Sequence, residues 1–131
     1  MNKKALAKPC PCGRPATLAR CCAPLIAGQP HADTAEALMR SRYSAYVLGA
    51  ADYLCATWHA STRPATLDLT DSPRWIGLQV LAAPPADGER ATVEFDARYR
   101  VHGRACHLHE LSRFVREDGR WYYVDGAIQP D

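Results

Sequence analysis

The sequence lacks the features that mark membrane, secreted and nucleotide-binding proteins. No apolar run approaches the roughly 20 residues that cross a bilayer, and the basic start MNKKALAKPC is not followed by an apolar stretch of signal-peptide length. We therefore expect a cytoplasmic protein with reduced thiols. Nucleophile-elbow, phosphate-loop and dinucleotide motifs are also missing. No catalytic residue is assigned: a binding role is favoured, and catalysis stays open.

Acidic residues are missing from the first 32 positions, and lysine is missing after position 8. Residues 1–32 therefore carry a charge of +5, whereas the rest, with 11 Arg and 14 acids, carries −3. The positive tip could contact an acidic protein partner or simply be solvated. Its basic residues are Lys3, Lys4, Lys8, Arg14 and Arg20. No basic groove interleaves with the aromatic residues, so nucleic acid is a disfavoured partner.

The length and the apolar content indicate one folded domain. The chain has 131 residues, of which 47% are hydrophobic and 23% are charged, and this is enough apolar material for a core. Proline and glycine then divide the chain into residues 1–23, a linker at 24–32 and a main domain at 33–131.

Four of the six cysteines lie in the stretch CPCGRPATLARCC, at Cys10, Cys12, Cys21 and Cys22. A disulfide between adjacent cysteines is strained, because consecutive Cα atoms lie about 3.8 Å apart, below the usual disulfide range. Cross-pairing of the two halves is feasible on paper but disfavoured in a reducing compartment. Four thiolates at this density suit one structural zinc ion. Metal binding would then supply the folding energy of a segment too small to fold alone.

This stretch resembles the SEC-C motif, a zinc-binding element of the form C-x-C-x8-C-[CH]. It departs from the usual pattern at Gly13-Arg14-Pro15, where Gly-Ser-Gly is common, and at Leu18, where an aromatic is common. Further segments are similar to the YchJ-like family of bacterial proteins: LMRSRYSAY (38–46), WHAST (58–62) and ELSRFVREDGRWYYVDG (110–126). The resemblance implies a nuclear-transport-factor-2-like (NTF2-like, cystatin-like) body, a curved sheet around helices, but no reaction. By analogy with other SEC-C elements, it also implies that the zinc knot docks a protein partner.

Periodicity in the main domain predicts helices followed by strands. Asp33 or Thr34 can cap a helix that runs to about Leu48, and a second helix covers about 50–59. Residues 60–73 form a loop. Period-two patterns predict strands at 74–83, at 92–102, from the turn at Gly103 to about Glu117, and at 120–128, with a hairpin turn at Asp118-Gly119. The predicted class is α+β, an antiparallel meander packed on two helices.

The hairpin register places polar residues on the apolar sheet face. Counting back from Asp118-Gly119 puts Ser112 opposite Asp125 on the face that carries Glu110 and Phe114. Buried carboxylates need partners, and Arg42 is the natural counter-ion, with Arg40 second. The group is open to three interpretations: an ion-pair network that pins helix to sheet, a small-molecule pocket, or an acid–base site. The candidate pocket residues are Arg42, Tyr43, Tyr46, Trp58, His59, Tyr99, Glu110, Ser112, Trp121, Tyr123 and Asp125.

The remaining histidines and cysteines are weaker signals. His107 and His109 share the polar sheet face and are either solvated or part of a second metal site. Cys55 and Cys106 are isolated and fit packed thiols.

Overall fold

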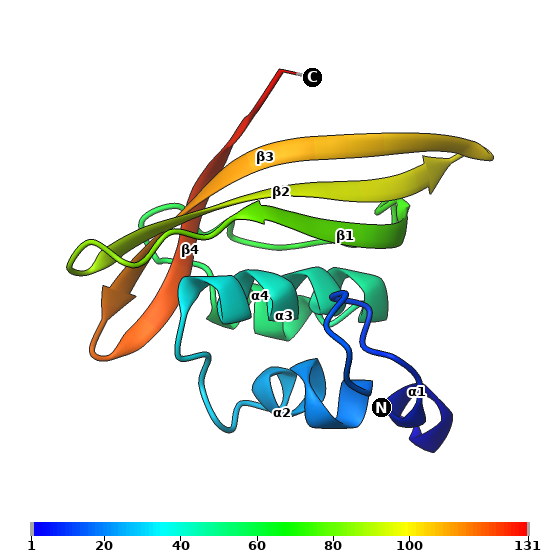
Figure 1. Cartoon of the computed structure of the whole chain (residues 1–131), viewed down its shortest axis with the longest axis horizontal. Helices are drawn as coiled ribbons and strands as arrows, with labels where there is room; N and C mark the ends of the chain where they lie inside the picture. The colour runs from blue at the N-terminus through cyan, green and yellow to red at the C-terminus, as the bar shows by residue number, and fades with distance from the viewer. Residues whose placement is uncertain (1, 131) are drawn as a thin grey trace.

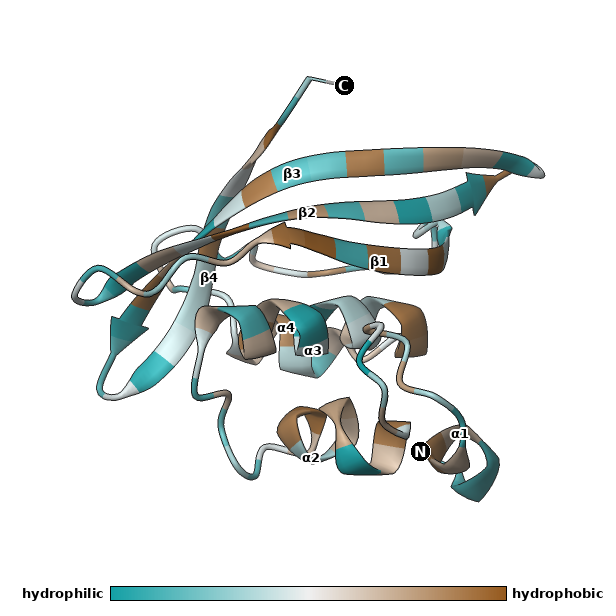
Figure 2. Cartoon of the chain, in the orientation of Figure 1, coloured by the Kyte–Doolittle hydropathy of each residue, from teal (hydrophilic) through white to brown (hydrophobic). Residues whose placement is uncertain are grey.

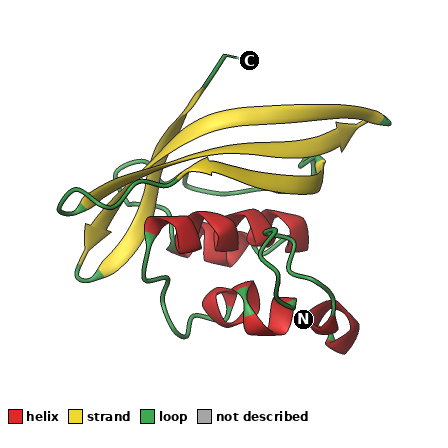
Figure 3. Ribbon diagram, in the orientation of Figure 1, coloured by secondary structure: helices red, strands yellow, loops and turns green. Residues whose placement is uncertain are grey.

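One antiparallel sheet forms the body of the computed structural model, which describes residues 2–130. Its order along the sheet is β1-β2-β3-β4. The strands are β1 Arg74–Ala82, β2 Arg90–Val101, β3 Arg104–Glu117 and β4 Arg120–Ile128. The sheet curves over a layer of helices that all lie on one of its sides (Figure 1, Figure 3). The predicted α+β meander is therefore confirmed.

Two-residue turns set the register of the two long hairpins. Asp118 and Gly119 have φ angles of 53° and 77°, as a type I′ turn requires, and they bring Glu117 opposite Arg120. His102 and Gly103 repeat this geometry between β2 and β3, with φ angles of 51° and 78°. Apolar and polar residues consequently alternate along β2 and β3 (Figure 2).

The main-domain helices are α3, Ala35–Leu48, and α4, Ala51–Ala56. The Thr34 side chain caps α3 by accepting a hydrogen bond from the Ala37 amide at 3.0 Å. Gly49, with φ of 74°, ends it. Helix α4 stops three residues before the predicted end at residue 59. The backbone at 57–59 instead bonds to β4: the Tyr123 amide donates to the Thr57 carbonyl, and the His59 amide to the Tyr123 carbonyl.

The N-terminal segment contains two short helices and a 3-10 turn. These are α1, Lys3–Ala7, the turn η1, Leu18–Arg20, and α2, Cys22–Ile26. Residues 24–26, expected as the start of a linker, belong to α2. Pro24 lies in its first turn, where proline is tolerated. Helices α1 and α2 lie on the side of α3 that faces away from the sheet (Figure 1).

Helix α3 lies between two hydrophobic clusters. The first joins α3 to the sheet through Leu38, Met39, Val93, Phe114 and Trp121. The second, which we call the knot core, contains Cys10, Cys12, Leu18, Cys22 and Ala23, with Leu48 and Leu78 packed against it. The knot core therefore shares apolar surface with α3 and β1. Among residues 2–130, no helix has the length and apolar character needed to cross a membrane.

Candidate metal centre and ligand cavity

The four clustered cysteines bring their sulfur atoms to one point. All four Sγ atoms of Cys10, Cys12, Cys21 and Cys22 lie within 4.8 Å of one another. Cys12 Sγ is 3.6 Å from Cys21 Sγ, which is 4.0 Å from Cys22 Sγ. Zinc–sulfur bonds of about 2.3 Å in a tetrahedron place sulfurs about 3.8 Å apart. The six cysteines are free thiols, so this cluster has the geometry of a metal site and not of a disulfide.

Local backbone structure holds the four sulfurs together. Cys10 and Cys12 lie in a turned segment, where the Cys10 amide donates to the Ala16 carbonyl at 2.8 Å and the Gly13 amide to the Cys10 carbonyl at 3.3 Å. Cys21 and Cys22 follow η1 and begin α2. Cys22, Cys12 and Cys10 are buried, whereas Cys21 is half-buried. The four clustered sulfur atoms are thus shielded from water on most sides.

Mutual contact separates the pKa values of the clustered thiols. Hydrogen bonds from Cys12 and Cys22 lower the pKa of Cys10, because they stabilise its thiolate. The same contact with Cys10 raises the pKa of Cys22. Burial, together with the contact to Cys12, raises the pKa of Cys21 to about 12. Four thiolates in one place therefore require a cation, and a divalent metal ion would supply it.

The cysteine knot is attached to the main domain by polar contacts. Arg40 of α3 donates from Nη1 to the Cys12 carbonyl at 2.6 Å and from Nε to Glu36 at 2.9 Å. Cys10 Sγ lies 3.6 Å from the Ser44 hydroxyl. Gly13, with φ of +91°, approaches the β1 backbone so closely that a Cβ there would lie 3.2 Å from the Leu78 carbonyl oxygen. Arg40, the second expected counter-ion for the sheet carboxylates, thus serves the knot instead.

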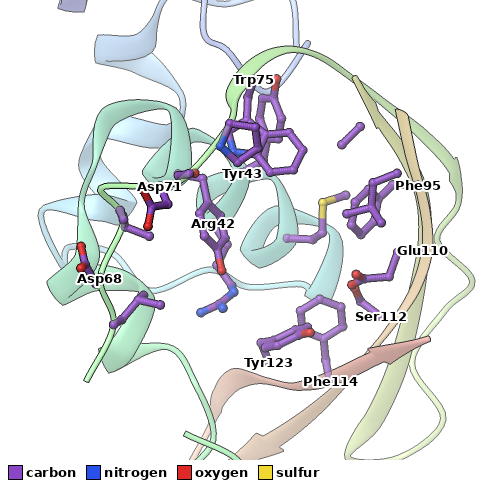
Figure 4. Close-up of a pocket in the computed structure, with 18 residues that line it drawn as sticks. Arg42, Tyr43, Asp68, Asp71, Trp75, Phe95, Glu110, Ser112, Phe114 and Tyr123 are labelled. Carbon is purple, nitrogen blue, oxygen red and sulfur yellow. The ribbon is translucent and has the colours of Figure 1, made fainter. Parts of the chain in front are cut away.

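A cavity of about 430 Å³ lies between α3 and the concave face of the sheet. Six predicted residues line it: Arg42, Tyr43, Tyr46, Glu110, Ser112 and Tyr123. Most of the remaining wall is apolar or aromatic, and residues 67–73, part of the loop predicted over 60–73, form one side (Figure 4). Trp75, which the sequence reasoning missed, also lines the cavity. Period-two patterning does not place a loop over a sheet, so it gave no signal for residues 67–73. Trp75 lies in the predicted strand 74–83, but no two-residue turn fixed the register of that strand, which has an irregularity directly after Trp75.

Arg42 is a buried cation with no carboxylate partner. Only 5% of its surface is exposed, and within residues 2–130 no carboxylate lies within 4.0 Å of its guanidinium. Its Nη1 donates to the Leu54 carbonyl and to Thr57 Oγ1, both at 2.7 Å. The guanidinium carbon lies 5.0 Å from the Trp58 ring centroid and 4.6 Å from that of Tyr123. Burial lowers the pKa of Arg42, although arginine remains charged at neutral pH.

The expected pairing of Arg42 with Asp125 is wrong. A β-bulge at Val124 shifts the β4 register, so that Asp125 pairs with Arg113 and Gly126 lies opposite Ser112. Asp125 therefore faces away from the cavity and forms a bidentate ion pair with Arg113. Glu110 stays on the cavity face, where its Oε2 accepts a hydrogen bond from Ser112 at 2.6 Å. The arginine–carboxylate network predicted between helix and sheet does not form among these residues.

Four other pocket candidates lie outside the cavity wall. Trp58 stacks on Arg42 and, edge to face, on Tyr123, with ring centroids of the two aromatics 5.2 Å apart. His59 bonds to Glu117 and Ser61. Tyr99 packs behind Trp75 at 5.3 Å between centroids. Trp121 lies in the cluster between α3 and the sheet.

The two strand histidines have separate carboxylate partners. His107 Nδ1 lies 2.9 Å from Asp96 Oδ2, and His109 Nε2 lies 2.6 Å from Glu94 Oε2. Of the described part of the chain, only the four cysteines bring three or more potential metal ligands together. The histidines therefore do not form a second cluster.

The fold and the cysteine cluster define the protein as an NTF2-like domain with an N-terminal four-cysteine knot. The family profile of the YchJ middle NTF2-like domain matches residues 34–126. The chain belongs to this YchJ-like family, whose members include UPF0225 proteins of known sequence. A UPF0225 protein of Polaromonas naphthalenivorans is 53% identical over 130 residues, which cover 90% of this chain and 96% of the relative. A UPF0225 protein of Chromobacterium violaceum is 52% identical over 134 residues, which cover 97% of this chain and 98% of that relative.

Two solved structures share the architecture. The solution structure of a SEC-C motif-containing protein from Rhodopseudomonas palustris superposes with a TM-score of 0.84 at 38% identity, covering 92% of this chain and 98% of that one. The crystal structure of a SEC-C motif-containing protein from Psychrobacter arcticus gives a TM-score of 0.81 at 30% identity, covering 98% of this chain and 86% of that one. This chain therefore shares its curved sheet on helices with both of these proteins.

Proposed function

We propose that this protein is a zinc-stabilised binding protein whose cavity takes a small molecule with an anionic group. The observation that carries the proposal is Arg42, a buried and unpaired cation on the wall of a largely apolar cavity. A buried charge without a partner is costly, and an incoming anion would supply the missing partner through a charge-assisted hydrogen bond. Small-molecule sites combine such apolar walls with a few fixed polar groups.

Binding is favoured over acid–base catalysis by the position of the carboxylates. The acid–base hypothesis needs two carboxylates on one sheet face, so that each shifts the pKa of the other. The bulge moves Asp125 to the opposite face of the sheet. Glu110 remains on the cavity face, next to Ser112. The cytoplasmic location expected from the sequence fits a cluster of free thiols.

Zinc is the proposed metal of the knot, with Cys10, Cys12, Cys21 and Cys22 as its ligands. The sulfur spacing suits a tetrahedral ion, and four protein ligands close the coordination shell, as in structural sites. Mass-spectrometric elemental analysis should find about one zinc per chain. Cys12→Ser should release the metal, whereas Cys55→Ser, which alters a thiol outside the cluster, should retain it. A metal-free, well-ordered wild type would contradict the assignment.

Ligand binding is tested with an aromatic carboxylate that matches the cavity chemistry. Indole-3-propionate should bind the zinc-loaded protein in isothermal titration calorimetry. Arg42→Met should weaken this binding roughly tenfold or more, because a charge-assisted hydrogen bond is lost. The matched control is Arg98→Met, which removes an exposed arginine from the sheet. Equal binding by both variants and the wild type would exclude Arg42 as the anion site.

A docking role for the knot is the second candidate function. The basic residues of the knot are all exposed, and Arg14 also lies 3.8 Å from Glu36 in an ion pair. The exposed set suits an acidic protein surface. If the knot docks such a partner, changing the three lysines to glutamate should abolish a salt-sensitive complex. The matched triple change at Arg98, Arg100 and Arg104 should leave that complex intact.

A further inference from the structure

Glu110 gives the cavity a second, oppositely charged pole. It lies on β3 on the sheet side of the cavity, whereas Arg42 reaches in from α3 (Figure 4). Ser112 donates to Oε2 at 2.6 Å. Over the described range 2–130, no hydrogen bond or ion pair reaches the other oxygen, Oε1. One oxygen is therefore fixed by the protein, and the other is available as an acceptor.

The bulge in β4 makes room for this carboxylate. Gly126 lies beneath Glu110, and a Cβ at that position would come within 2.2 Å of Glu110 Oε2. Any other residue at 126 would thus displace the carboxylate from its position next to Ser112. The register shift that turns Asp125 away also brings Gly126 opposite Ser112. The bulge in β4 therefore leaves Glu110 as the sheet carboxylate in the cavity, and it also places Gly126 where the Glu110 side chain needs space.

The two charges are held apart instead of neutralising each other. Arg42 is anchored by Leu54 and Thr57, and Glu110 by Ser112. No ion pair joins the Arg42 guanidinium and the Glu110 carboxylate in residues 2–130, so their charged atoms are more than 4.0 Å apart. Arg42 is buried and Glu110 is partly buried, and among residues 2–130 neither has a counter-charge within ion-pair distance. A ligand with two separated charges of its own would satisfy both.

Acidic residues at the side of the cavity narrow the ligand class further. Asp68 and Asp71 lie on the loop that lines it, and both are exposed (Figure 4). With Glu110 they outnumber Arg42 three to one among the charged lining residues. A dianion would be repelled by this field, whereas a molecule with a balancing cationic group would not.

We infer that the cavity selects a dipolar ligand, with a carboxylate on Arg42 and an ammonium group on Glu110, joined through an apolar or aromatic body. This inference rests on the proposed binding function and adds the class of ligand. The edges and faces of Tyr43, Trp75 and Phe114 would contact the apolar body.

Three matched probes test the dipolar class by calorimetry on the zinc-loaded protein: tryptophan, indole-3-propionate, which lacks the amine, and tryptamine, which lacks the carboxylate. Tryptophan should bind roughly tenfold or more tightly than either, since it adds a charge-assisted contact. Glu110→Gln and Gly126→Ala should reduce its affinity to that of indole-3-propionate without weakening the latter. Gly77→Ala is the matched control, because a Cβ at that strand glycine meets nothing within 4 Å.

The outcomes separate the two proposals. If indole-3-propionate binds as tightly as tryptophan, and both require Arg42, the dipolar inference is wrong and the anion site stands. If tryptamine binds most tightly and Arg42→Met has no effect, the proposed function itself is overturned. Failure of all three probes to bind also overturns the proposed function.

Discussion

Leu18 tests whether the cysteine knot is part of the core or an appendage. Only 2% of its surface is exposed, and it belongs to the knot core, against which Leu48 of α3 and Leu78 of β1 pack. Leu18→Ala removes three carbons, at about 0.8 kcal/mol for each buried group, or about 2.4 kcal/mol. The contacts of Arg40 and of the four clustered cysteines would keep the surroundings from collapsing, so a cavity cost adds to this value. We expect a loss of about 3–4 kcal/mol in the free energy of unfolding.

The position of the tryptophans makes the measurement specific. Trp58, Trp75 and Trp121 are the three tryptophans of the chain, and none lies in the knot, so guanidinium unfolding followed by their fluorescence reports on the main domain. The matched control is Leu81→Ala, at a leucine that is 45% exposed, with an expected loss of about 1 kcal/mol or less. If Leu18→Ala lowers zinc retention but reduces the free energy of unfolding of the main domain no more than Leu81→Ala does, the knot is an appendage and the reasoning is refuted.

Two further predictions concern the knot backbone and alkaline pH. Gly13→Ala should lower the free energy of unfolding by about 1–3 kcal/mol, because of its positive φ and its approach to Leu78. Gly28→Ala, at φ of +92° with no neighbour within 4 Å, should lower it less in the same denaturation assay. Equal losses would show that the approach to Leu78 does not matter. Burial, helped by the charge of Glu110, raises the pKa of Tyr123 to about 12 from 10.0. The folded protein thus keeps a proton that the unfolded chain releases, so the free energy of unfolding should fall between about pH 10 and pH 12. Tyr123→Phe should flatten this decline, and an unchanged slope would contradict the assignment.

Local signals in the sequence were sufficient for most of the fold. Asp118-Gly119 predicted a turn with two positive φ angles, and parity then placed Glu110, Ser112 and Phe114 on one face, where all three line the cavity. The helix predicted from a cap at Asp33 or Thr34 to about Leu48 agrees with α3, and Thr34 is the residue that caps it. The spacing of four cysteines predicted their convergence. These features depend on neighbours in the chain or on one hairpin, where turn geometry and side-chain alternation leave few options.

The candidate site was decided by long-range contacts. The bulge at Val124 coincides with the pairing of residues 57–59 with β4, a contact between segments more than 60 residues apart that no local pattern encodes. It turned Asp125 outward and set Gly126 beneath Glu110. Arg42 is likewise buried because α4 and Trp58 close around it. By itself the sequence determined which residues lie in helices and strands and where the cysteines gather; the tertiary structure alone decided which charges face each other, because a shift of one residue in a strand reverses the direction of every side chain beyond it.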